Sequence, residues 1–368
     1  MKRIWSQCVK ELAQFRRDRL TFALAFILPL GMLLIFGYAI RLETKNIPLA
    51  IQDFDASPLS RSYVERLFAT NQFQPIAWSG EGDAIAIIDQ GLAKATVVIP
   101  PDFSRRIKDQ KASSIQVLVD GTDVNNARVI RNSIRATTNF FLQSQGLRPR
   151  TANVVARIRL WFNPGRKESL FIVPGLYAVI LAIFPALLST LAMVREKEQG
   201  TIVQVYASNL SATELLLGKG LAYFIVSIGE ALCIMGLGSL LFRIEFAGNP
   251  LPFLLGTGLF AAASVLYGLF IGGRANNRIA AVQGVAFTGF LASFLFSGFI
   301  YPLSNIPFPI SLISNIVPAR YYIDVTRDAF VRGTGWGSVW VALIAISLLA
   351  LLFFAAAWRG LRRMQLSD

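Results

Sequence analysis

Few side chains in this sequence have the type and spacing that catalysis requires. The chain contains no histidine and two cysteines, Cys8 and Cys233. The lack of histidine excludes a histidine-based catalytic triad and a histidine metal site. Neither cysteine lies in the long polar insertion described below, so we expect no disulfide there. The candidate functional residues are therefore charged side chains beside or inside apolar segments, where binding and ion pairing are the available chemistry.

The densest group of mixed charges separates two apolar segments. It lies within AMVREKEQGTIVQV (192–205) and comprises Arg195, Glu196, Lys197 and Glu198, with Gly200 and Thr201 following. Charges of both signs keep a connection in water and can set the register of a protein partner. The alternative is a solvated connection whose charges determine only the membrane topology.

Gly218 and Lys219 resemble the end of a phosphate-binding loop. That loop needs a glycine five positions before the Gly-Lys pair and a serine or threonine after it. Neither residue is present in LLLGKG (215–220), and no other segment fits better. We therefore expect no nucleotide site, metal or other cofactor in this chain.

Glu230 lies in the middle of the apolar run YFIVSIGEALCIMGL. A carboxylate at the centre of a membrane helix costs about 2.5–3.5 kcal/mol on insertion scales. Something must compensate, and two interpretations stay open. Glu230 is either a pathway or relay residue, or it forms a buried hydrogen bond between helices.

The elements that hold these residues are predicted to be membrane spans. The chain has 368 residues, of which 54% are hydrophobic and 16% charged, whereas soluble domains have about 25% charged residues. Residues 20–40 form an uncharged run, and about 20 apolar residues cross a bilayer as a helix. The run is too long for a cleaved signal peptide, so we expect an uncleaved anchor. Five further spans are predicted, near 172–194, 220–242, 253–273, 280–301 and 338–358.

The distribution of basic residues predicts the orientation. Fourteen of them lie in residues 1–20, in the 194–219 and 274–278 connections and in the tail 359–368, whereas the two short connections on the other side hold four. Basic residues in short connections stay cytoplasmic. Both termini are therefore predicted to be cytoplasmic and residues 41–169 extracytoplasmic. The net charge of +14 reflects this topology and does not indicate nucleic-acid binding.

Residues 41–169 alternate between strand and helix patterns. Strands are predicted at 47–53, 73–78, 94–100, 115–120 and 154–162. Helices are predicted from a Ser57 cap with Pro58 in the first turn, at 82–91, at 101–109 and at 125–145. This alternation favours an α/β domain with a mixed sheet.

Other patterns concern the membrane part (170–358). Residues 1–19 are predicted to form an amphipathic interfacial helix with Trp5, Cys8, Val9, Leu12 and Phe15 on one face; the alternative is a solvated start of the first span. Spacing by four puts Ser264, Gly268 and Gly272 on a face for close helix packing. Gln283, Phe287 and Phe294 share a face of the fifth span, where they either line a substrate pathway or only pack in the bundle. Segment 302–333 is predicted to be a re-entrant element at the outer face, with Arg320 and Arg327 each pairing with Asp324.

Several separated motifs resemble one family. LLSTLAMVREKEQGTIVQVYASNLSATELLLGKGLAYF is similar to the segment of ABC-2 exporter permeases in which a span ends in an Arg-Glu-x-Glu-x-Gly-Thr cluster and a Leu-Leu-x-Gly-Lys element follows. SGFIYPLSNIP and VPARYYIDVTRDAFVRG resemble the outer re-entrant element of that family. IQDFDASPLSRSYVERL, VVIPPDFSRRI, VLVDGTD and WFNPGRKESLFIVPG resemble its bacterial drug-efflux subgroup, which has a large periplasmic domain after the first span.

The resemblance implies an α-helical membrane protein with six transmembrane helices and an inserted α/β periplasmic domain. It implies that segment 195–212 is a coupling helix on which a separate ATP-binding-cassette ATPase docks, with ATP and Mg²⁺ bound on that subunit. The implied role is efflux of a drug-like or lipid-like substrate from the inner membrane of a bacterium. A second permease, identical or paralogous, would complete the unit, and a periplasmic adaptor would meet the external domain.

Two alternatives from other classes remain. One is a non-transporting receptor or secretion-assembly protein that shares the same membrane half. The other is a proton-coupled transporter that uses Glu230.

Overall fold

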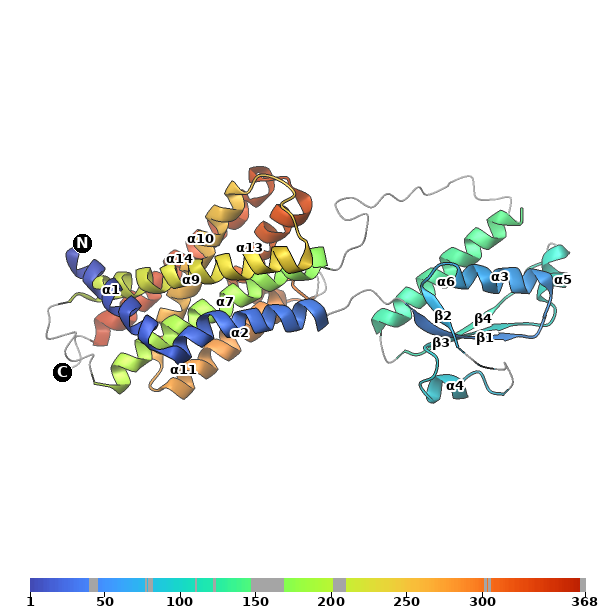
Figure 1. Ribbon diagram of the computed structural model, residues 1–368, viewed down its shortest axis with the longest axis horizontal. Coiled ribbons are helices and arrows are strands. Elements are labelled where there is room, and N and C mark those ends of the chain that lie inside the picture. The colour runs from blue at the N-terminus through green and yellow to red at the C-terminus, as the bar shows by residue number, and fades with distance from the viewer. Residues whose placement is uncertain are drawn as a thin grey trace. The chain divides into compact units, whose positions relative to one another are not determined.

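The computed structural model describes residues 1–39, 46–76, 78, 82–109, 111–121, 124–146, 169–200, 210–300, 303 and 306–364. The chain divides into two compact units (Figure 1). The helical unit comprises Met1–Ile40 and Arg159–Asp368, and the α/β unit comprises Arg41–Ile158.

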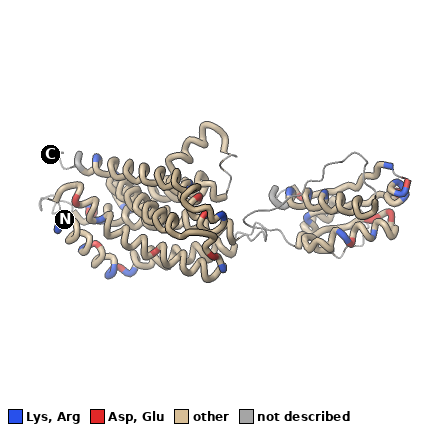
Figure 2. The backbone as a smooth tube through the Cα atoms, turned by 90° about the horizontal axis from the view of Figure 1, so that it is seen from above, with Lys and Arg blue, Asp and Glu red and all other residues tan. Residues whose placement is uncertain are grey.

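Among its described residues, the helical unit has six helices long and apolar enough to cross a membrane. They are α2 (Arg19–Ala39), α7 (Ser169–Glu198), α9 (Ala212–Phe242), α10 (Leu251–Arg274), the run α11 (Arg278–Val285), η1 (Ala286–Leu291) and α12 (Ala292–Phe296), and α14 (Trp336–Met364). These confirm the six predicted spans. Charged residues gather at the two ends of this unit (Figure 2).

Helix α7 lies at the centre of the unit and packs closely on α10. A Cβ atom added at Gly268 would lie 2.1 Å from Ser189 Oγ, and one at Gly272 would lie 2.7 Å from the Thr190 carbonyl oxygen. Thr190 Oγ1 donates a hydrogen bond of 2.7 Å to the Gly268 carbonyl. The predicted small-residue face, which includes the buried Ser264, is therefore a close helix contact.

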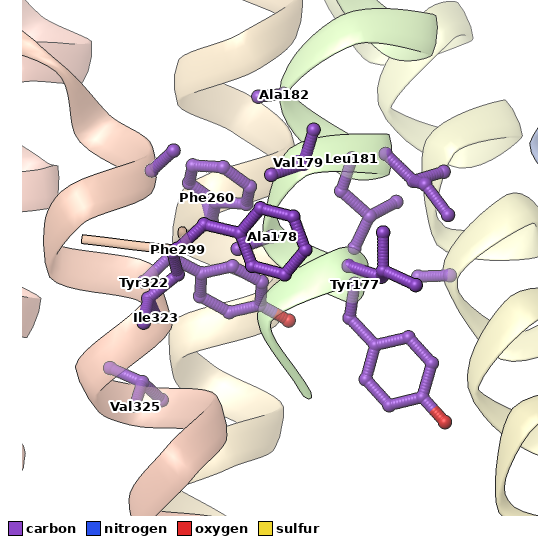
Figure 3. Packing of buried hydrophobic residues seen from close by; sticks show 14 of the residues in the cluster. Tyr177, Ala178, Val179, Leu181, Ala182, Phe260, Phe299, Tyr322, Ile323 and Val325 are labelled. Carbon is purple, nitrogen blue, oxygen red and sulfur yellow. The ribbon is translucent and has the colours of Figure 1, made fainter. Parts of the chain in front are cut away.

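Aromatic side chains pack together in the hydrophobic core of the helical unit (Figure 3). The ring of Phe260 stacks on Tyr322 with centroids 4.2 Å apart. The Tyr322 hydroxyl lies 2.7 Å from Thr257 Oγ1, which satisfies a polar group that burial would otherwise leave unpaired.

The predicted outer element consists of short helices: η3 (Ile310–Ile316), α13 (Pro318–Arg327) and η4 (Asp328–Arg332). Pro318 occupies the first turn of α13, where its missing N–H costs no helix bond. The predicted pairing of Arg320 and Arg327 with Asp324 is wrong. Arg320 instead contacts Asn315 and Tyr321, Arg327 contacts the Phe299 carbonyl and the Phe171 ring, and Asp324 is exposed.

The α/β unit has a mixed sheet with strand order β2–β1–β3–β4. The strands are β1 (Ile47–Asp53), β2 (Phe73–Pro75), β3 (Ala95–Ile99) and β4 (Gln116–Val119). β1 is parallel to β2 and β3, and β4 is antiparallel to β3. The four strands confirm the mixed sheet, and the strand predicted at 154–162 lies outside the described residues.

Helices cover both faces of this sheet (Figure 1). α3 (Pro58–Phe68), α5 (Phe103–Lys108) and α6 (Val124–Ser144) share one core, and α4 (Ala86–Asp89) packs on the other face. The predicted Ser57 cap is present, because its hydroxyl accepts a hydrogen bond from the Ser60 N–H at 3.1 Å. Gly146, at φ +70°, follows α6.

Candidate coupling site

The four consecutive charges form the last turn of α7. The sequence placed them in a connection after a span ending at residue 194, but α7 continues through Glu198. Gly200 then adopts a φ of +67°, a conformation that suits glycine after a helix. Thr201 lies outside the described residues. The charges therefore have fixed helical positions.

A buried chain of alternating charges connects three helices. Lys219 Nζ of α9 lies 3.1 Å from Glu196 Oε1 of α7 and 2.7 Å from Glu11 Oε1 of α1 (Lys2–Arg17). Lys219 is 0% exposed, Glu11 1% and Glu196 5%. Lys10 Nζ also approaches Glu196 Oε1, at 3.1 Å. The opposite charges compensate one another where water does not reach them, so removal of one would leave another unpaired.

Arg195 extends this chain of charges to the junction between α1 and α2. Its guanidinium lies 3.6 Å from Asp18 Oδ2 and 4.0 Å from Glu11 Oε2. Asp18 also accepts hydrogen bonds from the Thr21 hydroxyl and the first N–H groups of α2. The bond from Thr21 lowers the pKa of Asp18, with a further contribution from Arg195. We call Lys10, Glu11, Asp18, Arg195, Glu196 and Lys219 the ion-pair cluster.

The other two charges of the row bind the connection between α10 and α11. Lys197 Nζ donates to the carbonyls of Gly273 and Ala275. Glu198 Oε2 lies 2.7 Å from Arg278 Nε, and Glu198 Oε1 accepts the Arg278 N–H at 2.8 Å. The end of α7 thus contacts the α10–α11 connection as well as α1 and α9.

Helix α1 lies against α9 because a glycine permits close approach. A Cβ atom at Gly218 would lie 2.7 Å from Gln7 Cβ. The predicted apolar residues divide between two environments, since Cys8 and Phe15 are buried against the bundle while Trp5 and Val9 are exposed, and the charged Glu11 is buried beside Cys8. Glu11 lies three residues after Cys8 and therefore on the same, buried face of α1. This spacing is the sequence signal from which the burial of Glu11 could have been predicted.

The expectation that all four charges stay in water is therefore wrong. Glu196 is buried and paired within the chain, and Arg195 and Lys197 are half-buried. Only Glu198 of the row is exposed, followed by the exposed Gln199 and Gly200. The arrangement can transmit a displacement of the α7 end to α1, α9 and α11, because ion pairs and hydrogen bonds join all four.

The four candidate pathway residues are not brought together. Gln283 and Phe287 are exposed, whereas Phe294 packs on Phe36 and Phe299. The predicted common face of the fifth span is wrong, because the π-helical η1 intervenes between Phe287 and Phe294. A π turn accommodates an extra residue and shifts the helix phase.

Glu230 lies on a different helix from the other three, α9, where it is fully buried. Neither of its carboxylate oxygens has a hydrogen-bond partner among the described residues. The proposed hydrogen bond between helices is therefore not present in the described part of the chain, and Glu230 is not at a solvent-accessible wall.

Comparison with known proteins identifies the family. A family model described as "ABC-2 family transporter protein" matches residues 19–359. The chain belongs to the ABC-2 family of transporter proteins. The match spans the helices that carry the charged row and the inserted α/β unit.

Individual relatives agree with this family. The probable multidrug ABC transporter permease YbhS of Escherichia coli K12 is 26% identical over 98% of this chain and 97% of its own length. The probable multidrug ABC transporter permease YbhR of the same strain is 27% identical over 98% of both chains. ABC transporter G family member 20 of Dictyostelium discoideum is 21% identical over 94% of this chain but 49% of its own length.

The ABC-2 chain is thus the permease of an ABC exporter, a membrane component of transport rather than an enzyme. Its six apolar helices and its relatives are those of a multi-pass inner-membrane protein of bacteria. Permeases of this kind work with an ABC ATPase and a paired permease.

Proposed function

We propose that this permease exports a hydrophobic or amphipathic substrate, drug-like or lipid-like, by alternating access. A separate ATPase docks at the end of α7, around Glu198 and the segment that leads to α9. ATP and Mg²⁺ act on that subunit. The observation that carries this proposal is the contact of the α7 end with three other elements, through buried ion pairs to α1 and α9 and a surface ion pair to α11.

The ion-pair cluster gives the coupling a physical route. Closure of an ATPase pair displaces the end of α7, and Lys219 and Glu11 make α9 and α1 follow. The contact of α7 with α10 through Gly268 and Gly272 extends the motion along the membrane helices. Tightly packed helices move as units because their interfaces do not deform continuously.

The rest of the proposal concerns the orientation of the chain in the membrane and its partner permease. Both termini are cytoplasmic and the α/β unit is periplasmic, where it caps the exit or meets an adaptor. Six helices are few for enclosing a path, so a second permease, identical or paralogous, supplies the other half. The two residue classes that support this orientation are the basic groups of α1 and those of the inner connections.

The docking proposal is tested by co-purification from the native host in mild detergent. The variant Glu198→Arg places like charges at the Arg278 pair and also reverses the exposed charge offered to a partner. Combining it with Arg278→Glu restores the internal pair but leaves the exposed charges exchanged. We expect the ATPase to accompany the wild type and to be lost from both variants.

The results distinguish a docking role of Glu198 from a purely structural role. Recovery of the ATPase in the double variant would assign Glu198 to internal structure alone and move the docking surface elsewhere. Absence of any ATPase from the wild type under all mild conditions would overturn the exporter mechanism and favour a receptor role. Gel filtration of each variant checks that the permease itself stays folded.

A further inference from the structure

A pocket of about 510 Å³ lies within the helical unit, apart from the ion-pair cluster. It is lined by α7, α10, the fifth span, the η3–α13 turn and α14, and it is open on one side. Its walls include Phe260, Tyr267, Phe287, Ser293, Ile316 and Phe353. Of the four pathway residues predicted from sequence, only Phe287 belongs to it.

The volume is too large for a packing defect. Protein interiors are close-packed, with few voids larger than a water molecule. Small-molecule sites occupy about 300–1,000 Å³ and combine apolar walls with a few polar groups. The pocket fits that description in both respects.

The lining determines the chemistry of a ligand. Among the described residues that line the pocket, none is charged; they are apolar or aromatic except for four hydroxyl-bearing side chains. Two of these, Tyr267 of α10 and Thr288 of η1, hydrogen bond to each other across the pocket wall. An ionised group would lose its hydration here without a counter-charge, so the bound part of a ligand must be neutral.

The exposed rim indicates where a ligand enters. Phe287 is 68% exposed, Ile316 65% and Leu352 58%, and each lines the pocket. Phe287 and Leu352 lie on spans predicted to cross the bilayer. An apolar rim at that depth opens toward hydrocarbon rather than water.

The backbone around the pocket is also unusual. The π-helical η1 supplies Phe287, Thr288, Gly289 and Leu291 to the lining. π turns interrupt the regular helix and occur frequently at functional sites. Here the turn directs Phe287 and Thr288 to the pocket while Phe294, further along, packs in the core.

We propose that this pocket binds the neutral, apolar body of a small molecule that enters from the bilayer, with the Tyr267 and Thr288 hydroxyls orienting it. The inference deepens the export function and rests on it for the meaning of the bound molecule. Binding itself needs no ATPase. Ser264 lines the pocket on α10, the helix that packs on α7, so an occupant would contact a helix joined to the coupling end.

Photolabelling of the full chain in lipid nanodiscs tests the proposal. The probe is the neutral, apolar photolabel trifluoromethyl-iodophenyl-diazirine, and labelled peptides are mapped by mass spectrometry. We expect labelling of the 286–296 and 313–319 segments to saturate with probe concentration. Labelling of helix faces that merely contact lipid rises linearly instead.

A pocket-filling variant and a matched control make the test specific. Ala292→Phe adds a ring inside the pocket, whereas Ala286→Phe adds the same ring at an exposed position of the same span outside the lining. We expect at least a five-fold loss of saturable labelling in the first and none in the second. Tyr267→Phe, which keeps the ring and removes only the hydroxyl, is a milder second variant expected to retain the fold and to change the labelled positions.

The outcomes are decisive in each direction. Linear labelling at these segments, or equal labelling of Ala292→Phe and Ala286→Phe, overturns the proposal.

Native mass spectrometry distinguishes the sources of the ligand. A co-purified lipid released one-for-one by the probe identifies a membrane lipid, and saturable binding without lipid release identifies a drug-like molecule. Either result stands even if ATPase docking at Glu198 fails, because the permease alone is labelled.

Discussion

The ammonium group of Lys219 lies 2.7 Å from a carboxylate oxygen of Glu11, and neither side chain is more than 1% exposed. The two residues are 208 positions apart in the chain. Their contact joins an N-terminal helix to the start of a membrane span. It places the charged pair beside Glu196 at the end of α7, and so joins α1 to the helix bundle at this end.

The two lysines that bind Glu196 should contribute unequally to stability because they differ in burial. Lys219 and Lys10 both lie 3.1 Å from its Oε1 atom, but the Lys10 side chain is 43% exposed. We expect Lys219→Met to lower the free energy of unfolding by about 3–5 kcal/mol, because two carboxylates lose their buried counter-charge. Lys10→Met should cost about 1 kcal/mol or less. Thermal unfolding in detergent provides the comparison, and equal losses would contradict a buried cluster.

Two glycines of α10 should respond oppositely to alanine. At Gly268 a Cβ atom would clash with Ser189 and Ala186, whereas at Gly258 nothing lies within 4 Å. We expect Gly268→Ala to destabilise the protein by about 1–3 kcal/mol through overpacking. Gly258→Ala should stabilise it by up to about 1 kcal/mol, because alanine favours the helix. A Gly268→Ala protein with unchanged melting temperature would argue against the close α7–α10 contact.

Asp328 should make stability depend on pH. Burial alone would raise the pKa of its carboxyl, but hydrogen bonds from Thr334, Gly335 and Ser338 hold that pKa below the usual value. The bonds stabilise the charged form, so their contribution is complete above about pH 4. It is lost as the pH falls through the lowered pKa of Asp328.

The variant Asp328→Asn tests this sign. It should reduce the free energy of unfolding by about 1–3 kcal/mol at neutral pH, and the difference from wild type should shrink in acid. The exposed Asp324→Asn serves as the control, with an effect within about 0.5 kcal/mol. A difference that stayed constant down to the acid limit would rule out the titration of Asp328 as its source.

Glu230→Gln distinguishes an ATP-driven from a proton-driven permease. The glutamine has nearly the same shape and removes the ionisable group. Since neither carboxyl oxygen of Glu230 has a hydrogen-bond partner among the described residues, the substitution breaks no described contact, and we expect the melting temperature to stay the same or rise. Substrate-stimulated ATP hydrolysis by the reconstituted complex should persist. Transport that survives removal of the ATPase and disappears in Glu230→Gln would establish the proton-coupled alternative.

The sequence alone was sufficient for the six spans and for the described strands and helices of the α/β unit. Apolar length, a serine cap before Pro58 and glycine after a helix act within a few residues, so the chain displays them locally. The family motifs around Arg195 and Lys219 were equally visible. The contacts that those residues make could not be predicted, because a motif specifies residue types and not the side chains that they contact.

Only the tertiary structure decided which charges are buried and which pair. Glu196 and Glu198 are two residues apart, yet one binds Lys219 of α9 inside the bundle and the other binds Arg278 at its surface. A shift of helix phase at η1 also separated Phe287 from Phe294, which a regular helix period would align. Burial, pairing and phase depend on neighbours remote in the chain, and for that reason no local pattern could determine them.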